Sequence, residues 1–389
     1  MREHFLLDPD IVFLNHGSYG ACPREVIAEQ QRWQLEMERN PVAFLGRRSA
    51  GLLAEARAAL AAYLGAQGED LVFVPNATTG VNIVARSLQL EPGDEVLGTD
   101  HEYGACEAAL RFVCDKAGAH YRRVEIPLPF EPAQFVSRMR AAITPRTKLV
   151  YASHLSSVTA LIFPVAELCA MARELGLKTL IDGAHAPGHV ALDLAAVGAD
   201  FYTGNCHKWL CAPKGSAFLH ARPERQAEID VTVISWGYLA EGAGAGAGGH
   251  TGFDAYTGRT TFERRLQWQG TRDLSAFLAV PSAINFQQRH GWPAHQARCH
   301  ALALTSAERV RQRNGQPPVA GGESYGQMVT MPVRCDDAAA LHHGLFERHR
   351  IEVPVTQHAG HTFVRLAVQA YNTEAEIAAL EAALAEAGV

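Results

Sequence analysis

Short apolar runs alternate with longer amphipathic segments through the middle of the chain, between residues 70 and 220. The apolar runs are typical of strands buried on both faces, and the segments between them repeat hydrophobic residues with helical spacing. We expect strands at 70–74, 94–98, 120–125, 148–153, 178–182, 198–202 and 215–219, and helices at 80–90, 105–117, 132–142 and 165–175. This alternation predicts an α/β domain whose central sheet is mostly parallel and carries helices on both faces.

The segments on either side of this alternation predict two further parts of the molecule. Residues 13–20 read as a short strand entering a polar glycine turn. Helices are expected at 24–38, 48–64, 276–290, 337–349 and 373–387, and strands near 328–333 and 362–368. We therefore expect an N-terminal arm (1–22) that packs against the small domain, a large domain (23–275), and a connecting helix with a small C-terminal α/β domain (276–389).

One stretch departs from this pattern, because residues 241–252 consist largely of glycine and alanine. Such a composition is typical of a flexible segment. The sequence leaves two interpretations open, a mobile flap over a functional site and a plain solvent loop.

Composition excludes several classes of function. The 389 residues carry a net charge of −6, which argues against a nucleic-acid or membrane surface. No apolar run approaches the ~18 residues of a membrane span, and the segment after Met1 does not resemble a signal peptide, so we expect a cytoplasmic protein. The eight cysteines are scattered without metal-type spacing, which predicts reduced thiols and no metal site.

The chemistry of the chain centres on Lys208, which lies between a histidine and a tryptophan on the loop joining two predicted strands. Burying an ammonium group without a partner is costly. The cost is acceptable when the amine is itself the reagent, as in a Schiff base with a carbonyl cofactor. The same pattern also fits a surface lysine whose flanking strands are misplaced.

Asp182 ends the strand expected at 178–182 and is followed by a glycine turn. Ligands of open α/β sheets bind outside the carboxyl ends of the strands. An aspartate there can pair with the protonated ring nitrogen of pyridoxal 5'-phosphate (PLP) and keep the ring an electron sink. Taken alone, Asp182 also fits a helix N-cap. Together, Asp182 and Lys208 on neighbouring strands favour PLP as the cofactor.

Two other strand-end loops add polar groups to the same predicted edge. Thr78 and Thr79 lie in a small polar turn between a strand and a helix, an arrangement that can cradle an anion or simply cap the helix. His101 and Tyr103 follow the strand at 94–98, where a flat ring can stack on a cofactor ring or pack as part of the loop.

With these residues, the chain resembles the class V aminotransferase family of fold-type I PLP enzymes, and within it the isopenicillin N epimerase-like branch. The resemblance runs from Phe13 to Tyr371. Its anchors are Phe13-Leu14-Asn15-His16-Gly17-Ser18, Asn76-Ala77-Thr78-Thr79, Asp182-Gly183-Ala184-His185-Ala186-Pro187-Gly188, Gly204-Asn205-Cys206-His207-Lys208-Trp209, and Arg365 with Tyr371-Asn372. It implies a mostly parallel sheet in a large domain and a smaller α/β C-terminal domain.

The resemblance also implies how PLP is held. Lys208 matches the Schiff-base lysine, Asp182 the partner of the pyridinium nitrogen, and His185 the residue that bonds the ring oxygen of the cofactor. The matches to phosphate ligands are Thr78, Thr79, Asn205 and His207. Thr271 matches a threonine that the family donates to the phosphate of the neighbouring subunit, which implies a homodimer with shared sites.

The remaining matches concern the substrate and the exposed face of the cofactor. Arg365 matches the arginine that clamps the substrate carboxylate, a bidentate task suited to guanidinium, and Asn15 and His16 are implied as substrate contacts. His101 and Tyr103 are alternatives for stacking on the cofactor, and Tyr103 is also a candidate proton donor.

Two departures from the family pattern bear on the reaction. Cysteine desulfurases need a nucleophilic cysteine shortly before the clamp arginine, and no cysteine lies between Cys335 and Arg365, so persulfide transfer is not expected. The asparagine common in desulfurases after the polar strand-end histidine is replaced by Ser157. The contact that this position makes to the cofactor oxygen must therefore differ.

We therefore expect an enzyme that removes the α-proton of an amino acid with Lys208 as the base. The residues leave three outcomes open, which are epimerisation, β-elimination of a C–S bond, and transamination as the less favoured one. Tyr103 can serve as the acid for either of the first two. A binding protein of this fold without turnover is the alternative of another class.

Overall fold

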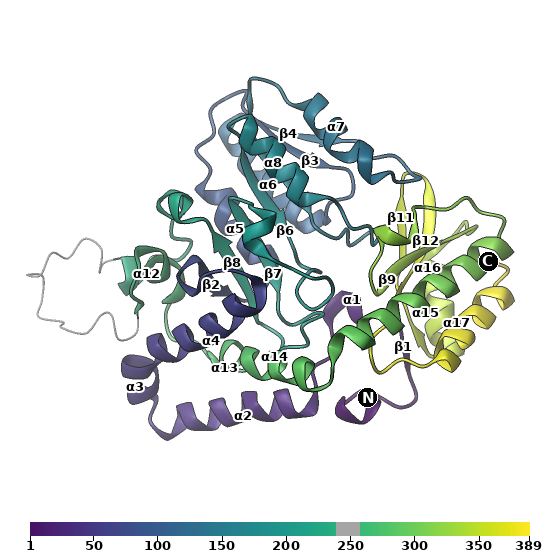
Figure 1. Ribbon diagram of the computed structural model, residues 1–389, viewed down its shortest axis with the longest axis horizontal. Helices are drawn as coiled ribbons and strands as arrows, with labels where there is room; N and C mark the ends of the chain where they lie inside the picture. The colour runs from purple at the N-terminus through teal and green to yellow at the C-terminus, as the bar shows by residue number, and fades with distance from the viewer. Residues whose placement is uncertain (239–256) are drawn as a thin grey trace, which may run out of the picture.

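The computed structural model describes residues 1–238 and 257–389, so the glycine- and alanine-rich run 241–252 lies outside the described residues. Its centre is a seven-stranded sheet with the strand order β2-β8-β7-β6-β5-β3-β4 (Figure 1). The strands are β2 (Leu71–Val74), β3 (Glu95–Thr99), β4 (His120–Val124), β5 (Thr147–Ser153), β6 (Lys178–Asp182), β7 (Phe201–Asn205) and β8 (Ala217–Ala221). All run parallel except β8, which is antiparallel to both of its neighbours. The expected α/β fold with a mostly parallel central sheet is confirmed.

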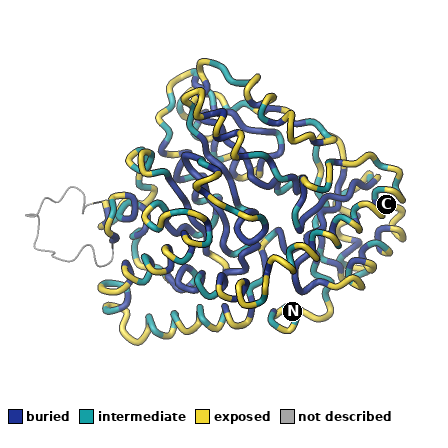
Figure 2. Tube along the Cα trace, in the orientation of Figure 1, coloured by how far each residue is buried: buried dark blue, intermediate teal, exposed yellow. Residues whose placement is uncertain are grey.

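Successive side chains of these strands belong to two different apolar cores. In β5, Leu149 and Tyr151 join one core, whereas Val150 and Ala152 join the other. Side chains alternate between the two faces of a strand, so both faces of this sheet are covered. Figure 2 shows the result as a buried centre beneath more exposed helices. The near-continuous apolar runs of the sequence follow from this double burial.

Helices connect the parallel strands. They are α5 (Ala77–Ser87), α6 (Gly104–Ala117), α7 (Pro132–Ala142), α8 (Val165–Glu174) and the short α9 (Leu194–Val197). The helix expected at 80–90 begins earlier, at Ala77, because the side chain of Asn76 caps it by accepting a hydrogen bond from the backbone N–H of Thr79 (2.8 Å). The polar turn of the sequence is therefore already the first turn of α5.

A group of N-terminal and connecting helices packs beside the sheet. It comprises α1 (His16–Tyr19), α2 (Arg24–Arg39), α3 (Pro41–Ala43), α4 (Ser49–Leu64), α12 (Thr261–Gln267), α13 (Ser275–Leu278) and α14 (Val280–Arg289). The single helix expected at 276–290 is in fact α13 and α14, with Pro281 at the start of the second. No helix of the described residues is long and apolar enough to cross a membrane.

The C-terminal part builds a second, antiparallel sheet with the order β11-β12-β9. Its elements are β9 (Met328–Val333), β10 (Ile351–Glu352), β11 (Val355–His358), β12 (His361–Ala367), α15 (Trp292–Arg313), α16 (Ala338–His349) and α17 (Glu374–Glu386). The elements α15, β10 and β11 are not among those expected from the sequence. In α15 the buried positions beyond the first turn include Cys299, Ala303 and Ser306, and such small side chains give only a faint helical pattern.

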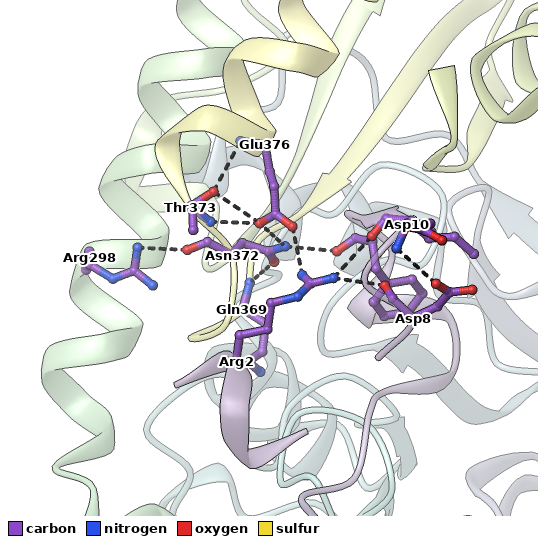
Figure 3. A network of polar contacts seen from close by, with 10 residues as sticks. Arg2, Asp8, Asp10, Arg298, Gln369, Asn372, Thr373 and Glu376 are labelled. Atoms are coloured by element: carbon purple, nitrogen blue, oxygen red, sulfur yellow. Dashed lines mark hydrogen bonds and ion pairs between the residues drawn. The ribbon is translucent and has the colours of Figure 1, made fainter. Parts of the chain in front are cut away.

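The N-terminal arm lies against this C-terminal part. β1 (Val12–Phe13) pairs in parallel with β10, and the Arg2 guanidinium forms an ion pair with Glu376 (2.8 Å). Figure 3 shows how the network continues: Asn372 donates to the carbonyl of Phe13 (2.9 Å) and, over 3.2 Å, to Glu376. The arm thereby places α1 at the boundary between the two sheets, where the candidate site lies.

Candidate active site

A cavity of about 580 Å³ opens at the carboxyl ends of β5, β6 and β7. Ser153, Asp182 and Asn205, the last residues of these three strands, all line it. The loops that follow the strands, the first turn of α5 and part of α1 complete its wall. The cavity therefore occupies the position at which parallel α/β sheets bind ligands.

Lys208 lines the cavity from the loop between β7 and β8. A contact with α1 holds this loop in place, because the carbonyl of Lys208 lies 3.0 Å from Nε2 of His16. The Nζ atom lies 3.1 Å from Nε2 of His185. Burial lowers the pKa of Lys208 to about 8, with Arg365 adding to the effect and Asp182 opposing it. An amine with this pKa is substantially neutral near pH 8, as a nucleophile or a base requires.

Asp182 is a buried carboxylate at the end of β6. It accepts hydrogen bonds from the backbone N–H of Ala184 (2.9 Å), from the Tyr151 hydroxyl (3.3 Å) and from the Cys106 thiol (3.4 Å). Burial raises the pKa of Asp182, and these bonds oppose the rise. A cationic group bound in the cavity would restore the ionised carboxylate.

The first turn of α5 borders the cavity through Ala77 and Thr78, and the N-terminus of a helix is a favourable place for an anion. Thr78, Asn205 and His207 line the wall there, and Asn205 accepts from the N–H of Ala77 (2.8 Å). Gly80 allows the helix to lie this close to β7, since a Cβ atom at that position would lie 2.2 Å from the Thr203 hydroxyl.

Arg365 on β12 approaches the cavity from the second sheet. It donates to the Ser157 carbonyl, to the Ser157 hydroxyl (3.1 Å) and to the Ser18 hydroxyl (3.0 Å), and both serines line the cavity. The residue is only 4% exposed, and burial lowers its pKa to about 10. Within residues 1–238 and 257–389 it forms no ion pair, so an anionic ligand would supply the missing charge.

The structure brings most of the expected site residues together. Seven of them line the cavity: Thr78, Tyr103, Asp182, His185, Asn205, His207 and Lys208. Arg365 borders it through the two serines described above. Thr79 does not line the cavity, and its hydroxyl donates to the cap residue Asn76 (3.1 Å). Thr271 is exposed and lies outside the cavity of its own chain.

His101 requires a correction, because it does not line the cavity. Its ring is fully buried, with Nδ1 2.8 Å from the Thr159 hydroxyl and Nε2 2.8 Å from the carbonyl of Ile126. Both ring nitrogens are therefore occupied inside the fold. Of the two rings expected to stack on the cofactor, the structure leaves Tyr103, which lines the cavity and is 46% exposed.

Asn15 and His16 require a similar correction. Neither lines the cavity, and both are buried. Asn15 accepts from the Ser18 hydroxyl (2.6 Å) and thus orients a group that contacts Arg365. His16 contacts the Lys208 carbonyl and the Tyr371 hydroxyl (2.9 Å). We therefore assign them to the support of the site instead of to substrate contact.

Tyr19 and Lys214 also line the cavity, although neither was among the site residues expected from the sequence. Tyr19 is 75% exposed at the end of α1, and Lys214 lies six residues after Lys208. Tyr19 belongs to the polar glycine turn that the sequence did show. Lys214 gave no signal, since a lysine beside a glycine fits any surface loop.

The sheet topology and the lysine–aspartate pair at its strand ends define a fold-type I enzyme. Residues 12–380 match the model of the family described as aminotransferase class-V, and the chain belongs to that family. Isopenicillin N epimerase of Streptomyces clavuligerus is 39% identical over 98% of this chain and 96% of its own length. A protein of Arabidopsis thaliana named probable chloroplastic L-cysteine desulfhydrase is 30% identical over 71% of this chain and 58% of that protein.

Solved structures agree on the fold. The cystine C–S lyase C-DES, in complex with cysteine persulfide, has a TM-score of 0.79 at 23% identity and covers 97% of this chain and 98% of that one. The cysteine desulfurase CsdA of Escherichia coli has a TM-score of 0.78 at 19% identity, over 99% and 97%. The expected family, its epimerase-like branch and PLP as the cofactor are confirmed.

The residues of this chain fit PLP. Lys208 offers a partly neutral amine, Asp182 a buried carboxylate for a ring cation, and the first turn of α5 an anion site. All three border the same cavity, whose volume lies in the usual range for cofactor sites.

Proposed function

We propose that this enzyme removes the α-proton of an amino acid whose carboxylate is bound by Arg365. The supporting observation is the buried guanidinium of Arg365, which borders the Lys208 cavity and pairs with no carboxylate of the described chain. Bound PLP supplies an electron sink that acidifies the α-carbon. Lys208 then serves as the base, because its lowered pKa keeps much of the amine neutral.

Epimerisation is the reaction that we favour. Similarity to isopenicillin N epimerase extends over nearly the full length of both chains. An epimerase must return the proton to the opposite face of the α-carbon, and we assign that task to the Tyr103 hydroxyl on the cavity wall. The amino acid would then leave with inverted configuration.

β-Elimination of a C–S bond is the second candidate. It is favoured by relatives named L-cysteine desulfhydrase and by the hercynylcysteine sulfoxide lyase of Schizosaccharomyces pombe, which is 26% identical over 61% of both chains. In this reaction Tyr103 would protonate the leaving sulfur. No cysteine is among the residues that line the cavity in the described chain, so a persulfide-forming mechanism on an enzyme thiol has no candidate nucleophile.

We further propose a cytoplasmic homodimer. Thr271 is exposed and lies outside its own cavity, as a ligand donated to a neighbouring subunit would. The mass of the particle in dilute solution tests this assembly.

The experiment incubates the PLP-loaded protein with a panel of L- and D-amino acids in ²H₂O. We expect α-deuterium incorporation with loss of chirality for an epimerase, and, with cysteine as the substrate, pyruvate together with both ammonia and sulfide for a lyase. Arg365→Lys keeps the charge but loses the planar fork, which should cost about 1.5–3 kcal/mol and lower kcat/KM roughly ten- to hundredfold.

Cofactor content and Tm should hardly change in Arg365→Lys. A variant with normal kinetics and lowered stability would make Arg365 structural and would contradict the proposed carboxylate site.

A further inference from the structure

A buried indole lies directly behind the site. The Nε1–H of Trp209 donates to Nδ1 of His185 over 3.2 Å, and Nε2 of the same imidazole lies 3.1 Å from Nζ of Lys208. Trp209 is fully buried, and His185 is 2% exposed. The three side chains therefore form one continuous contact from the core to the cavity.

The indole fixes where the His185 proton lies. An indole N–H can only donate, so Nδ1 of His185 must accept and carries no hydrogen. Burial and the nearby Lys208 hold the pKa of His185 well below its usual range, so the ring is neutral. A neutral imidazole with a bare Nδ1 carries its single proton on Nε2, and this N–H faces the Lys208 amine.

A second histidine, His189, also has a fixed tautomer and packs against the indole of Trp209. The backbone N–H of Gln327, also an obligate donor, bonds Nε2 of His189 over 2.7 Å. The proton of His189 therefore lies on Nδ1, which is 3.2 Å from the His185 carbonyl. The His189 ring stacks on Trp209 with a centroid distance of 3.9 Å and an angle of 22°. The indole is thus held in one orientation.

We propose that Trp209 is a positioning residue that fixes the tautomer of His185, so that His185 presents an N–H and not a lone pair to Lys208 and the cavity. An N–H can donate to a neutral amine but repels an ammonium group, so this tautomer favours the neutral form of Lys208. The tautomer of His185 does not depend on the proposed function. Only its effect on turnover rests on the proposal that Lys208 is the base of the reaction.

Other charged groups act on the same pair and remain unchanged in the test. Lys208 is also faced by Arg365, which lowers its pKa, and by Asp182 and Cys106, which raise it. His185 is faced by Lys208, Arg365, His189 and His16. A change confined to the indole N–H therefore isolates the contribution of the tautomer.

Two variants of Trp209 test the proposal in the full-length protein freed of PLP. Trp209→Phe removes the N–H and shortens the ring, whereas replacement of Trp209 by benzothienylalanine removes the N–H and keeps the bicyclic shape. Without the donor, His185 can turn its Nε2 lone pair to Lys208 and accept from an ammonium group. The pH midpoint of Lys208, measured by trace acetylation and peptide mass spectrometry, should rise by about one unit in both variants.

Trp292→Phe is the matched control, because Trp292 is 3% exposed and its indole nitrogen has no hydrogen-bond partner in the described part of the chain. Its Lys208 midpoint should equal that of the unmodified protein. The tautomer itself is read from ¹⁵N-histidine spectra, with His185→Gln to assign the resonances: Nε2–H is expected in the unmodified protein, and a mixture or Nδ1–H in both Trp209 variants.

An unchanged midpoint and an unchanged tautomer in the benzothienylalanine protein would overturn the proposal, even if Trp209→Phe failed to fold. Failure of the proposed function is distinguishable, since it would appear as absence of α-proton exchange in the unmodified PLP-loaded enzyme. The acetylation and ¹⁵N results do not depend on that exchange.

Discussion

Two polar loops at the same edge of the central sheet behave differently. Asp182, the last residue of β6, and His185 in the loop that follows both line the cavity. After β3, Tyr103 reaches it, but His101 and Glu102 turn into the fold. The difference lies in the hydrogen-bond partners available inside the fold. The Thr159 hydroxyl and the Ile126 carbonyl bond the two ring nitrogens of His101. A polar side chain at a strand end can thus be turned away from the cavity when groups inside the fold hydrogen-bond all of its polar atoms, as they do for His101.

Glu102 shows the same effect for a carboxylate. It is 5% exposed and accepts from the Thr99 hydroxyl (2.6 Å), the Ser153 hydroxyl (2.7 Å) and the Ser153 backbone N–H (2.9 Å). These bonds tie the β3 loop to the end of β5. Asp182, in contrast, is one of the residues that line the cavity. We infer that the β3 loop positions Tyr103, whereas Asp182 and His185 at the end of β6 would contact a bound ligand directly.

The largest expected effect comes from Asp182→Asn. Removing one partner of a buried ion pair costs about 3–5 kcal/mol. Turnover of the PLP-loaded enzyme should therefore fall roughly 10²- to 10⁴-fold. Without PLP the variant should be more stable near neutral pH, because burial disfavours the charge of Asp182. Kinetics and thermal melts of both forms check this.

Asp200→Asn is the matched control for Asp182. Asp200 is a buried carboxylate that precedes β7, where it accepts from Thr179 (2.9 Å) and pairs with Arg225 (2.9 Å). This variant should lose stability and keep its turnover. Equal effects of the two substitutions on turnover would contradict a specific role for Asp182.

The next largest effect distinguishes Tyr103 from His101 within one loop. Tyr103→Phe removes the hydroxyl proposed as an acid, and kcat should fall about 10²-fold with little change in stability. His101→Leu leaves the Ile126 carbonyl without its partner and should cost about 1–3 kcal/mol in unfolding free energy, with kcat nearly unchanged. A His101→Leu enzyme that folds normally but loses turnover would show that the corrected assignment of His101 is wrong.

The smallest effect is a pH dependence from Glu102. Burial raises its pKa to about 7 from the ordinary value of 4.5. Between these values the folded protein keeps a proton that the unfolded chain has lost, so the contribution of Glu102 to stability decreases as the pH rises through this window. In Glu102→Gln that decrease should be absent. Urea unfolding at pH 5 and pH 7 measures it, and an identical slope in both proteins would contradict the account.

Much of this architecture is predictable from the sequence because strand burial leaves a strong signal. The strand at 178–182 and the helix at 132–142 have the bounds expected from the pattern. The start of α5 differs from the prediction because Asn76 caps the helix, so that it begins at Ala77, three residues before the expected start. The helix α15 was missed because small side chains fill its buried face.

The site was predictable as a set of residues and not as a geometry. The sequence pointed to Lys208 and Asp182 through their chemistry at the ends of predicted strands and to Arg365 through the family resemblance, and the structure places these residues in or beside one cavity. The motifs did not show which way His101 points, because its partner Thr159 lies 58 residues away in the chain. Nor did they show that Trp209 reaches His185 across 24 residues. Such contacts depend on packing between elements, which no local pattern records.

The most direct test of the account is chemical trapping of the lysine. The PLP-loaded enzyme is reduced with borohydride and digested, and the modified peptide is mapped by mass spectrometry. The reduced adduct should lie on Lys208, and Lys208→Ala should form none. An adduct on Lys178 or Lys214, or no adduct in the unmodified enzyme, would contradict the central claim that this cavity holds PLP through Lys208.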